Sequence, residues 1–222
     1  MADAGAPTGT DLPWQHMTAA AGLVLAAPVP ALDMDPGVLE ADLRAVKVAV
    51  PVADRSHVPH MAGWCNIELV GSDRAGNPVA RPAFRLMAGV AARLADSGLT
   101  ILSAFIIRNA AGWILDWHYD PLAPHREVAR LILPIRTSPG STTWMGHEAH
   151  HWPAGRCWAA DFTQPHRVDT DPAADRIILS LDVRMDAVAR ALLPMVLQQD
   201  ADRRMAVQQD AVNSLLAFRA AA

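Results

Sequence analysis

The chain has 222 residues, of which 51% are hydrophobic and 19% are charged, a composition typical of a packed protein rather than a disordered one. Its formal net charge is −4, and its lysines and arginines are scattered without a basic run. This distribution argues against nucleic acid or an anionic membrane surface as a partner. Cys65 and Cys157 are too few for a disulfide framework and lack the spacing of a zinc site.

The N-terminal residues carry acid rather than a basic segment, so a secretory signal is not expected. The apolar stretch 19–27 is too short to cross a bilayer. We therefore expect a cytoplasmic protein. Residues 1–13, rich in alanine, glycine, proline and threonine, are expected to form a mobile tail.

The first half of the chain predicts a mixture of strands and helices. Asp35 and Pro36 favour a helix start, because aspartate accepts from free N–H groups and proline suits the first turn. Gly98 suits the end of a second helix. The expected elements are a strand over 23–32 interrupted by prolines, a helix through 38–48, a strand over 64–70, a turn over 71–77 and a helix over 82–96.

From residue 99 the pattern changes to short β-rich segments separated by turns. Several short strands at close spacing are typical of a sandwich or jelly roll. The expected strands are 100–109, 112–119, 129–137, 142–145, 156–161, 167–169 and 176–183. After Asp186 the pattern becomes helical again, with a break at Pro194 and a last helix over 200–219.

We therefore predict one domain, 1–222, that is mainly β with flanking helices and has a double-stranded β-helix core of the jelly-roll, cupin-like type. The core is expected over about 99–184, with N-terminal support from 14–98 and C-terminal helices in 185–222. The apolar residues of these helices would either pack on the barrel or join two subunits in a homodimer. The sequence leaves both arrangements open.

His118, Asp120 and the distant His166 form the most informative pattern. Residues i and i+2 of a strand point to the same face, so His118 and Asp120 can grip one ion together. Two imidazoles and one carboxylate on one face of an octahedral iron(II) leave three open positions, which suits a bidentate keto acid and O₂. A histidine–x–aspartate pair alone is a weak signal, and its value depends on the elements that follow it.

Arg176 lies ten residues after His166 and opens the run Arg-Ile-Ile-Leu-Ser, in which Arg176 and Ser180 share a strand face. A guanidinium pairs bidentately with a carboxylate, and the serine adds a hydroxyl. Inside a barrel beside the metal, both would bind the distal carboxylate of 2-oxoglutarate. The alternative is an edge-strand arginine in a surface ion pair.

Several motifs together resemble the aspartyl/asparaginyl β-hydroxylase family, which includes bacterial hydroxylases of free amino acids such as the proline cis-4-hydroxylases. These motifs lie between residues 100 and 183: WHYD at 117–120, RLILP at 130–134, WPAGRCW at 152–158, HRVD at 166–169 and RIILSLD at 176–182.

The resemblance implies that His118, Asp120 and His166 are the iron ligands and that Arg176 anchors 2-oxoglutarate. It makes Arg130 a second cosubstrate or substrate contact, although Arg130 is equally well read as a strand residue paired with Asp120 or Glu127. Asp120 favours hydroxylation, since relatives that halogenate carry a small residue in its place.

The chain departs from the family pattern at three positions. Many members have histidine where this chain has Ile132, so one polar contact is missing or replaced. The usual Gly-Glu-x-Trp turn is here 155–158, with arginine at 156, and an asparagine common after the distal histidine is Asp169. These departures leave the cofactor assignment standing and put the substrate in doubt.

Residues 147–151, HEAHH, match the His-Glu-x-x-His signature of zinc peptidases, which needs both histidines one turn apart on a helix. Gly146 precedes the segment and Pro153 follows it closely, so we expect a loop near the barrel mouth rather than a helix. One histidine there could touch substrate, but incidental surface histidines are the simpler interpretation.

Seven tryptophans accompany one tyrosine. Alternation predicts that Trp113, Leu115, Trp117 and Tyr119 face away from His118 and pack against outer helices. Trp144 and Trp152 are candidates for a pocket wall, although core packing is the simpler role.

The sequence therefore predicts an iron(II)- and 2-oxoglutarate-dependent dioxygenase that uses O₂ to hydroxylate an unactivated C–H of a small molecule. By resemblance the substrate is an amino acid, free or carrier-tethered, or a related metabolite. Two alternatives remain: a cupin-type metal enzyme that does not use 2-oxoglutarate, and a non-catalytic jelly-roll binding module.

Overall fold

The computed structural model describes residues 12–50 and 63–221. Its strands form two antiparallel sheets. The strands are β1 Ala26–Pro28, β2 Trp64–Ser72, β3 Pro78–Ala80, β4 Ile101–Asn109, β5 Ile114–His118, β6 Val128–Arg136, β7 Thr142–Met145, β8 Glu148–His150, β9 Trp158–Ala160, β10 His166–Asp169 and β11 Arg176–Arg184. The helices are α1 Pro13–Ala20, η1 Pro30–Leu32, α2 Pro36–Ala49, η3 Pro82–Leu86, α3 Ala88–Ser97, α4 Ala187–Leu192, η4 Met195–Leu197 and α5 Ala201–Ala221.

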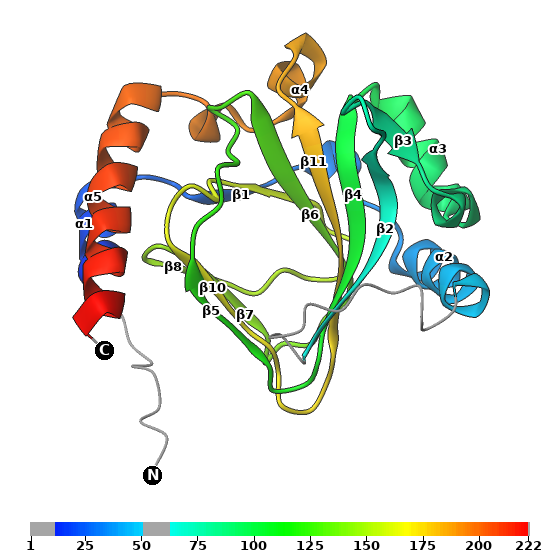
Figure 1. Cartoon of the computed structure of the whole chain (residues 1–222), viewed down its shortest axis with the longest axis horizontal. Coiled ribbons are helices and arrows are strands. Elements are labelled where there is room, and N and C mark those ends of the chain that lie inside the picture. Colours follow the sequence, from blue (N-terminus) through cyan, green and yellow to red (C-terminus); the bar gives the residue numbers. More distant parts are fainter. Residues whose placement is uncertain (1–11, 51–62, 222) are drawn as a thin grey trace.

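The larger sheet has the order β1-β9-β6-β11-β4-β2-β3, and the smaller sheet has the order β5-β10-β7-β8. Figure 1 shows the two sheets facing each other, with α2 and α3 outside the larger sheet and α1 and α5 side by side at the opposite edge of the molecule. This is the predicted jelly-roll architecture, mainly β with flanking helices. The proposed division of one domain into core and supports stays a prediction.

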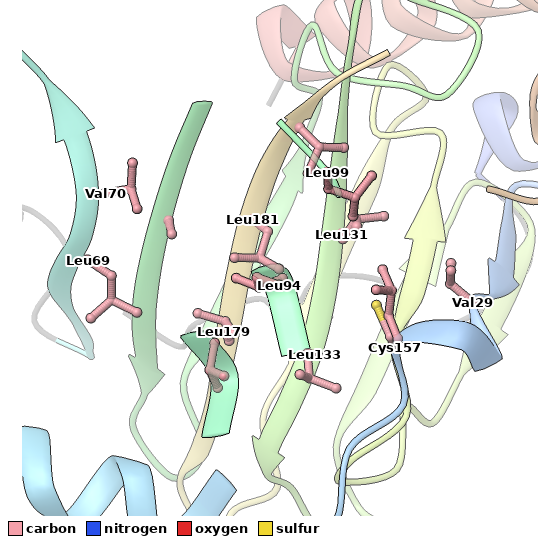
Figure 2. Packing of buried hydrophobic residues seen from close by; sticks show 14 of the residues in the cluster. Val29, Leu69, Val70, Leu94, Leu99, Leu131, Leu133, Cys157, Leu179 and Leu181 are labelled. Carbon is pink, nitrogen blue, oxygen red and sulfur yellow. The ribbon is translucent and has the colours of Figure 1, made fainter. Parts of the chain in front are cut away.

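The main hydrophobic core lies between the larger sheet and the helices outside it. Leu131 and Leu133 on β6 and Leu179 and Leu181 on β11 are all buried in it, side by side in Figure 2. Alternate residues of these strands point to the other face, toward the smaller sheet. The strands therefore carry an apolar outer face and a second set of side chains that is free to build a site.

Helix α2 begins where the sequence predicts. The Asp35 side chain accepts from the backbone N–H groups of Gly37 and Val38. The buried residues of α2 include Leu39, Leu43 and Val46. This capping satisfies donors that the first helical turn leaves free.

The single helix expected over 82–96 is wrong. The structure has the 3₁₀ helix η3, then Met87 in a non-helical conformation with its side chain fully buried, and then α3. The carboxylate of Asp42, on α2, accepts from the backbone of Gly89 and Val90. A tertiary contact thus starts a new helix here, and Gly98 ends it in the left-handed conformation as predicted.

Two other expectations are corrected at β1 and β8. The strand over 23–32 is reduced to Ala26–Pro28 followed by η1, because Pro28 and Pro30 have no N–H to donate. The loop expected over 147–151 instead contains β8, paired antiparallel with β7. The segment is not helical, so the peptidase geometry is absent.

The C-terminal helix α5 packs on α1 of the same chain. Trp14 of α1 contacts Trp117 and Phe218 edge to face, with 5.4 and 5.5 Å between the ring centroids. A homodimer through these helices stays a prediction. Of the expected N-terminal tail, residues 1–11 lie outside the described residues, and Pro13 already belongs to α1. No helix in the described parts of the chain combines the length and the apolar character that a membrane span needs.

Candidate active site

The three predicted metal ligands converge. His118 is the last residue of β5 and His166 the first of β10, and the two are paired directly across these strands. Asp120 follows β5 by two residues, and its backbone N–H donates to the carbonyl of Phe162 over 2.8 Å. One ligand atom from each of His118, Asp120 and His166 lies within 4.8 Å of the other two.

A β-bulge in β5 directs these side chains. His166 pairs with His118, but Val168 pairs with Leu115, so three residues of β5 span two residues of β10. The extra residue reverses the order in which the side chains of β5 alternate between its two faces. Leu115 therefore lines the same cavity as His118, contrary to the expectation that it faces outward, whereas Trp117 faces α1 as predicted.

Backbone carbonyls orient both imidazoles. His118 Nδ1 lies 2.7 Å from the carbonyl oxygen of Asp116, and His166 Nδ1 lies 3.0 Å from that of Gln164. A proton on Nδ1 that is donated to the carbonyl leaves the Nε2 lone pair available to a metal. Burial lowers the pKa of both histidines, and for His166 the neighbouring His118 lowers it further. Both rings are therefore neutral at pH 7, the form that binds a metal.

Arg130 is engaged by two carboxylates. Its Nη1 donates to Asp120 Oδ2 over 2.6 Å, while Nε and Nη2 donate to Asp182 over 2.7 and 3.1 Å. Of the two interpretations of Arg130, the ion pair with Asp120 is present in the structure. Its predicted contact with the cosubstrate stays a prediction.

Arg176 is a buried cation without a counter-charge. Its Nη1 donates to Asn109 Oδ1 over 3.1 Å and its Nη2 to Thr143 Oγ1 over 3.5 Å. No carboxylate of the described chain forms an ion pair with it. Burial lowers the pKa of Arg176 to about 10, so the group is still charged at neutral pH. A buried, uncompensated charge is costly, which makes this end of the cavity suited to an anion.

Ser180 lines the same cavity as Arg176, but Ile178 lies between them on the strand face. Four strand residues span about 13 Å between Cα atoms at roughly 3.3 Å per residue. Ser180 lies opposite Ile132 on β6 rather than beside the guanidinium. The hydroxyl that contacts Arg176 is that of Thr143, which the sequence did not single out.

These side chains surround one cavity of about 300 Å³ between the two sheets. Arg176, Asn109 and Thr143 line it together with the three candidate ligands. Ile132, at the position where many members of the resembled family carry histidine, contributes an apolar surface. The remaining apolar lining comes from Trp64, Ile107, Leu115, Trp152, Phe162, Val168 and Ile178.

Trp152, a candidate for the pocket wall, lines the cavity and stacks on Trp158 at 5.7 Å. Trp144 instead donates its indole N–H to Asp169 and packs against the cluster around Trp14. Trp64 was not predicted, because nothing in its local sequence shows that β2 crosses the cavity.

The histidine cluster 147–151 serves the N-terminal segment instead. Glu148 accepts from the backbone N–H groups of Leu25 and Ala26, both over 3.1 Å, and its carboxylate lies 2.9 Å from His150 Nε2. His147 contacts Thr18. None of these histidines lines the cavity. The residue that holds the start of β1 is Glu148, which His150 contacts in turn.

A family model described as Aspartyl/Asparaginyl beta-hydroxylase matches residues 39–186. The match runs from α2 to the start of α4 and includes every residue of the candidate metal site. It leaves out α1 and α5. No curated protein matches the chain.

Solved structures with a similar fold include the following two. An oxidoreductase of the 2OG-Fe(II) oxygenase family from Burkholderia pseudomallei is 14% identical, with a TM-score of 0.55 over 79% of this chain and 92% of its own. HygX from Streptomyces hygroscopicus, solved with nickel and 2-oxoglutarate bound, is 11% identical, with a TM-score of 0.51 over 76% of this chain and 86% of its own. At these identities the likeness establishes the fold alone.

Proposed function

The chain belongs to the aspartyl/asparaginyl β-hydroxylase family of iron(II)- and 2-oxoglutarate-dependent oxygenases, and we propose that it hydroxylates an unactivated C–H bond of an amino acid or an amino-acid-derived metabolite. One observation carries the site assignment: His118, Asp120 and His166 converge in the cavity that also holds the uncompensated cation Arg176.

The donor set fits iron(II). Two neutral imidazoles and a carboxylate form the ligand set of non-haem iron oxygenases and leave positions for a keto acid and O₂. We assign His118, Asp120 and His166 as the ligands. Backbone carbonyls orient the two imidazoles, and Arg130 orients the carboxylate of Asp120. When bound, iron couples the oxidative decarboxylation of 2-oxoglutarate by O₂ to the oxidation of a substrate C–H bond.

The protein residues have separate tasks in this proposal. Arg176 binds the distal carboxylate of 2-oxoglutarate and so fixes the keto-acid end toward the ligand cluster. Arg130 holds Asp120 in place through the 2.6 Å contact. The buried apolar residues of the wall, such as Phe162 and Ile178, limit the access of water to the reacting groups. Asp120 occupies the third ligand position, which supports hydroxylation rather than halogenation.

The cavity wall bears on the substrate. Among the described residues that line the cavity, only Arg176 and the doubly paired Arg130 are cationic, since both histidines there are neutral. Trp152, Ile132 and Leu115 offer apolar surface instead. The apolar surface favours a substrate with an apolar side chain. Because neither arginine is left to pair with a free carboxylate of the substrate, the lining also favours an amino acid whose carboxylate is masked, such as a carrier-tethered one.

Anaerobic absorbance of the protein with iron(II) and 2-oxoglutarate tests the proposal. We expect a weak visible charge-transfer band from the metal–keto-acid complex. The band should be lost in His166→Ala and kept in the control His16→Ala, whose side chain is exposed on α1. Bound iron without a band would favour a cupin-type enzyme, and failure to bind iron would contradict the metal-site assignment.

The substrate class is tested separately by succinate formation. Matched pairs of an apolar amino acid and its N-acetyl methyl ester should raise succinate output above the basal rate, the masked form more strongly. A stimulation by polar, charged amino acids alone would contradict the apolar-wall argument while leaving the cofactor assignment intact.

A further inference from the structure

We propose that Asn109 is a cosubstrate-binding residue that donates its side-chain amide N–H to the distal carboxylate of 2-oxoglutarate, with Thr143 as a second donor. The inference rests on the proposed function and deepens it, because it names the groups that complete the anion site around Arg176. None of these three residues belongs to the metal site itself.

Sheet pairing places Asn109 beside Arg176. Asn109 is the last residue of β4 and Arg176 the first of β11, and the two are direct partners across these antiparallel strands. Both side chains line the cavity. Asn109 is only 1% exposed, so water cannot readily satisfy its amide.

The hydrogen bond to Arg176 orients the amide. A guanidinium carries donors only, so it must meet the oxygen of Asn109 and not the nitrogen. The observed contact is Nη1 to Oδ1 over 3.1 Å. The amide nitrogen is thereby directed away from this contact, and the buried Nδ2 has no hydrogen-bond partner among the residues that the structure describes.

An unpartnered buried donor is unfavourable, which indicates that a ligand completes it. A carboxylate is the matching ligand. It offers several acceptor sites and also supplies the negative charge that Arg176 lacks. An aspartate at position 109 would have neutralised Arg176 within the protein. The amide instead leaves that charge for the ligand.

Thr143 approaches the same cation from the opposite sheet. It lies on β7, is 3% exposed, and its Oγ1 accepts from Arg176 Nη2 over 3.5 Å. A hydroxyl that accepts one hydrogen bond still has a proton to donate. Arg176, Asn109 and Thr143 therefore form a three-residue carboxylate site, in which two neutral donors flank one cation.

The test compares two keto acids that share the metal-binding end. 2-Oxobutyrate lacks the distal carboxylate of 2-oxoglutarate. Each is titrated anaerobically into the iron(II)-loaded protein, and the charge-transfer band reports the Kd. In Asn109→Ala the Kd for 2-oxoglutarate should rise about tenfold, as expected for loss of a hydrogen bond to a charged group. The Kd for 2-oxobutyrate should not change.

Two further variants sharpen the result. Asn109→Asp should weaken the binding of 2-oxoglutarate more than Asn109→Ala does, because the new carboxylate would pair with Arg176. Thr143→Val, which keeps the shape of the side chain, should also weaken the binding of 2-oxoglutarate but not that of 2-oxobutyrate. The matched control is Asn66→Ala on the neighbouring strand β2, since Asn66 is half-buried but does not line the cavity.

The outcomes separate the inference from the proposed function. The carboxylate site is overturned if Asn109→Ala and Thr143→Val weaken the binding of both keto acids equally, or of neither. The oxygenase assignment would still stand in that case. Absence of a band in the wild-type protein with either keto acid contradicts the proposed function itself.

Discussion

Arg130 joins Asp120 to Asp182: it donates to Asp120 over 2.6 Å and to the two oxygens of Asp182 over 2.7 and 3.1 Å. Asp182 lies directly opposite Arg130 in the pairing of β11 with β6, so the larger sheet positions the guanidinium. Asp120, in contrast, lies beyond the end of β5. The larger sheet thus orients a candidate metal ligand that is carried by the other sheet.

Loss of this support should weaken metal binding. Arg130→Met removes the contact to Asp120, and outer contacts of this kind are worth about 10- to 100-fold in metal affinity. We expect that loss in an iron(II) or cobalt(II) titration, with a smaller loss in Asp182→Asn. The exposed Arg74→Met is the control. Unchanged metal affinity in Arg130→Met would show that Asp120 needs no such support.

Arg176 should determine the affinity for 2-oxoglutarate and should have little effect on the affinity for iron(II). Arg176→Met removes a buried cation and keeps the length of the side chain, so the apparent 2-oxoglutarate requirement should rise strongly while iron(II) affinity changes little. Arg176→Lys should recover only part of the lost affinity for 2-oxoglutarate, because an ammonium cannot bind a carboxylate bidentately. The half-saturating 2-oxoglutarate concentration for succinate formation measures both effects. An unchanged requirement would assign Arg176 a structural role.

The strands of the core could be predicted from the sequence because they are short apolar, β-branched segments separated by turn residues. The expected segments 142–145 and 176–183 coincide with β7 and nearly with β11. The convergence of His118, Asp120 and His166 followed from the motif and the jelly-roll prediction. The helix break at Met87 could not be predicted, because it depends on Asp42 from another helix.

Cross-strand relationships in the site were also hidden from the sequence. The bulge that directs Leu115 into the cavity depends on how β5 pairs with β10. Asn109 and Thr143 show no local signal, and each contacts Arg176 only because the two sheets face each other. Residue types and spacing can suggest metal ligands, whereas neutral residues around a cation become visible only in three dimensions.

The C-terminal helix is predicted to stabilise the loop that precedes His166. Arg204 of α5 is 2% exposed, pairs with Asp161 over 3.2 Å and donates to the carbonyls of Gln199, Val24 and Val196. Its own carbonyl accepts from Gln164. Arg204→Met leaves a buried aspartate without its main partner, which typically costs about 3–5 kcal/mol.

Urea unfolding measures this cost. The control is Arg74→Met, because Arg74 is exposed on a turn, and it should lower the free energy of unfolding by less than about 0.5 kcal/mol, the usual range for surface substitutions. Similar losses for the two variants would mean that the Arg204–Asp161 pair is not a stabilising contact.

The stability of the protein should fall in mild acid, in part through His125. Its side chain is fully buried, with Nδ1 3.6 Å from Asp161 Oδ2 and with Arg204 and Arg126 nearby. Burial, together with the two arginine charges, lowers the pKa of His125, and Asp161 opposes the shift only partly. In the unfolded chain the pKa of a histidine is about 6.5.

The sign follows from proton linkage. Between the lowered folded pKa and about 6.5, the unfolded chain binds more protons than the folded protein, so the free energy of unfolding decreases as the pH falls. One histidine contributes at most about 1.4 kcal/mol per pH unit. Urea unfolding at pH 7.5 and 5.5 measures the decrease, to which His118 and His166 contribute in the same direction. His125→Gln should make the decrease smaller. An equal pH dependence in wild type and His125→Gln would show that His125 is protonated in the folded protein as readily as in the unfolded chain.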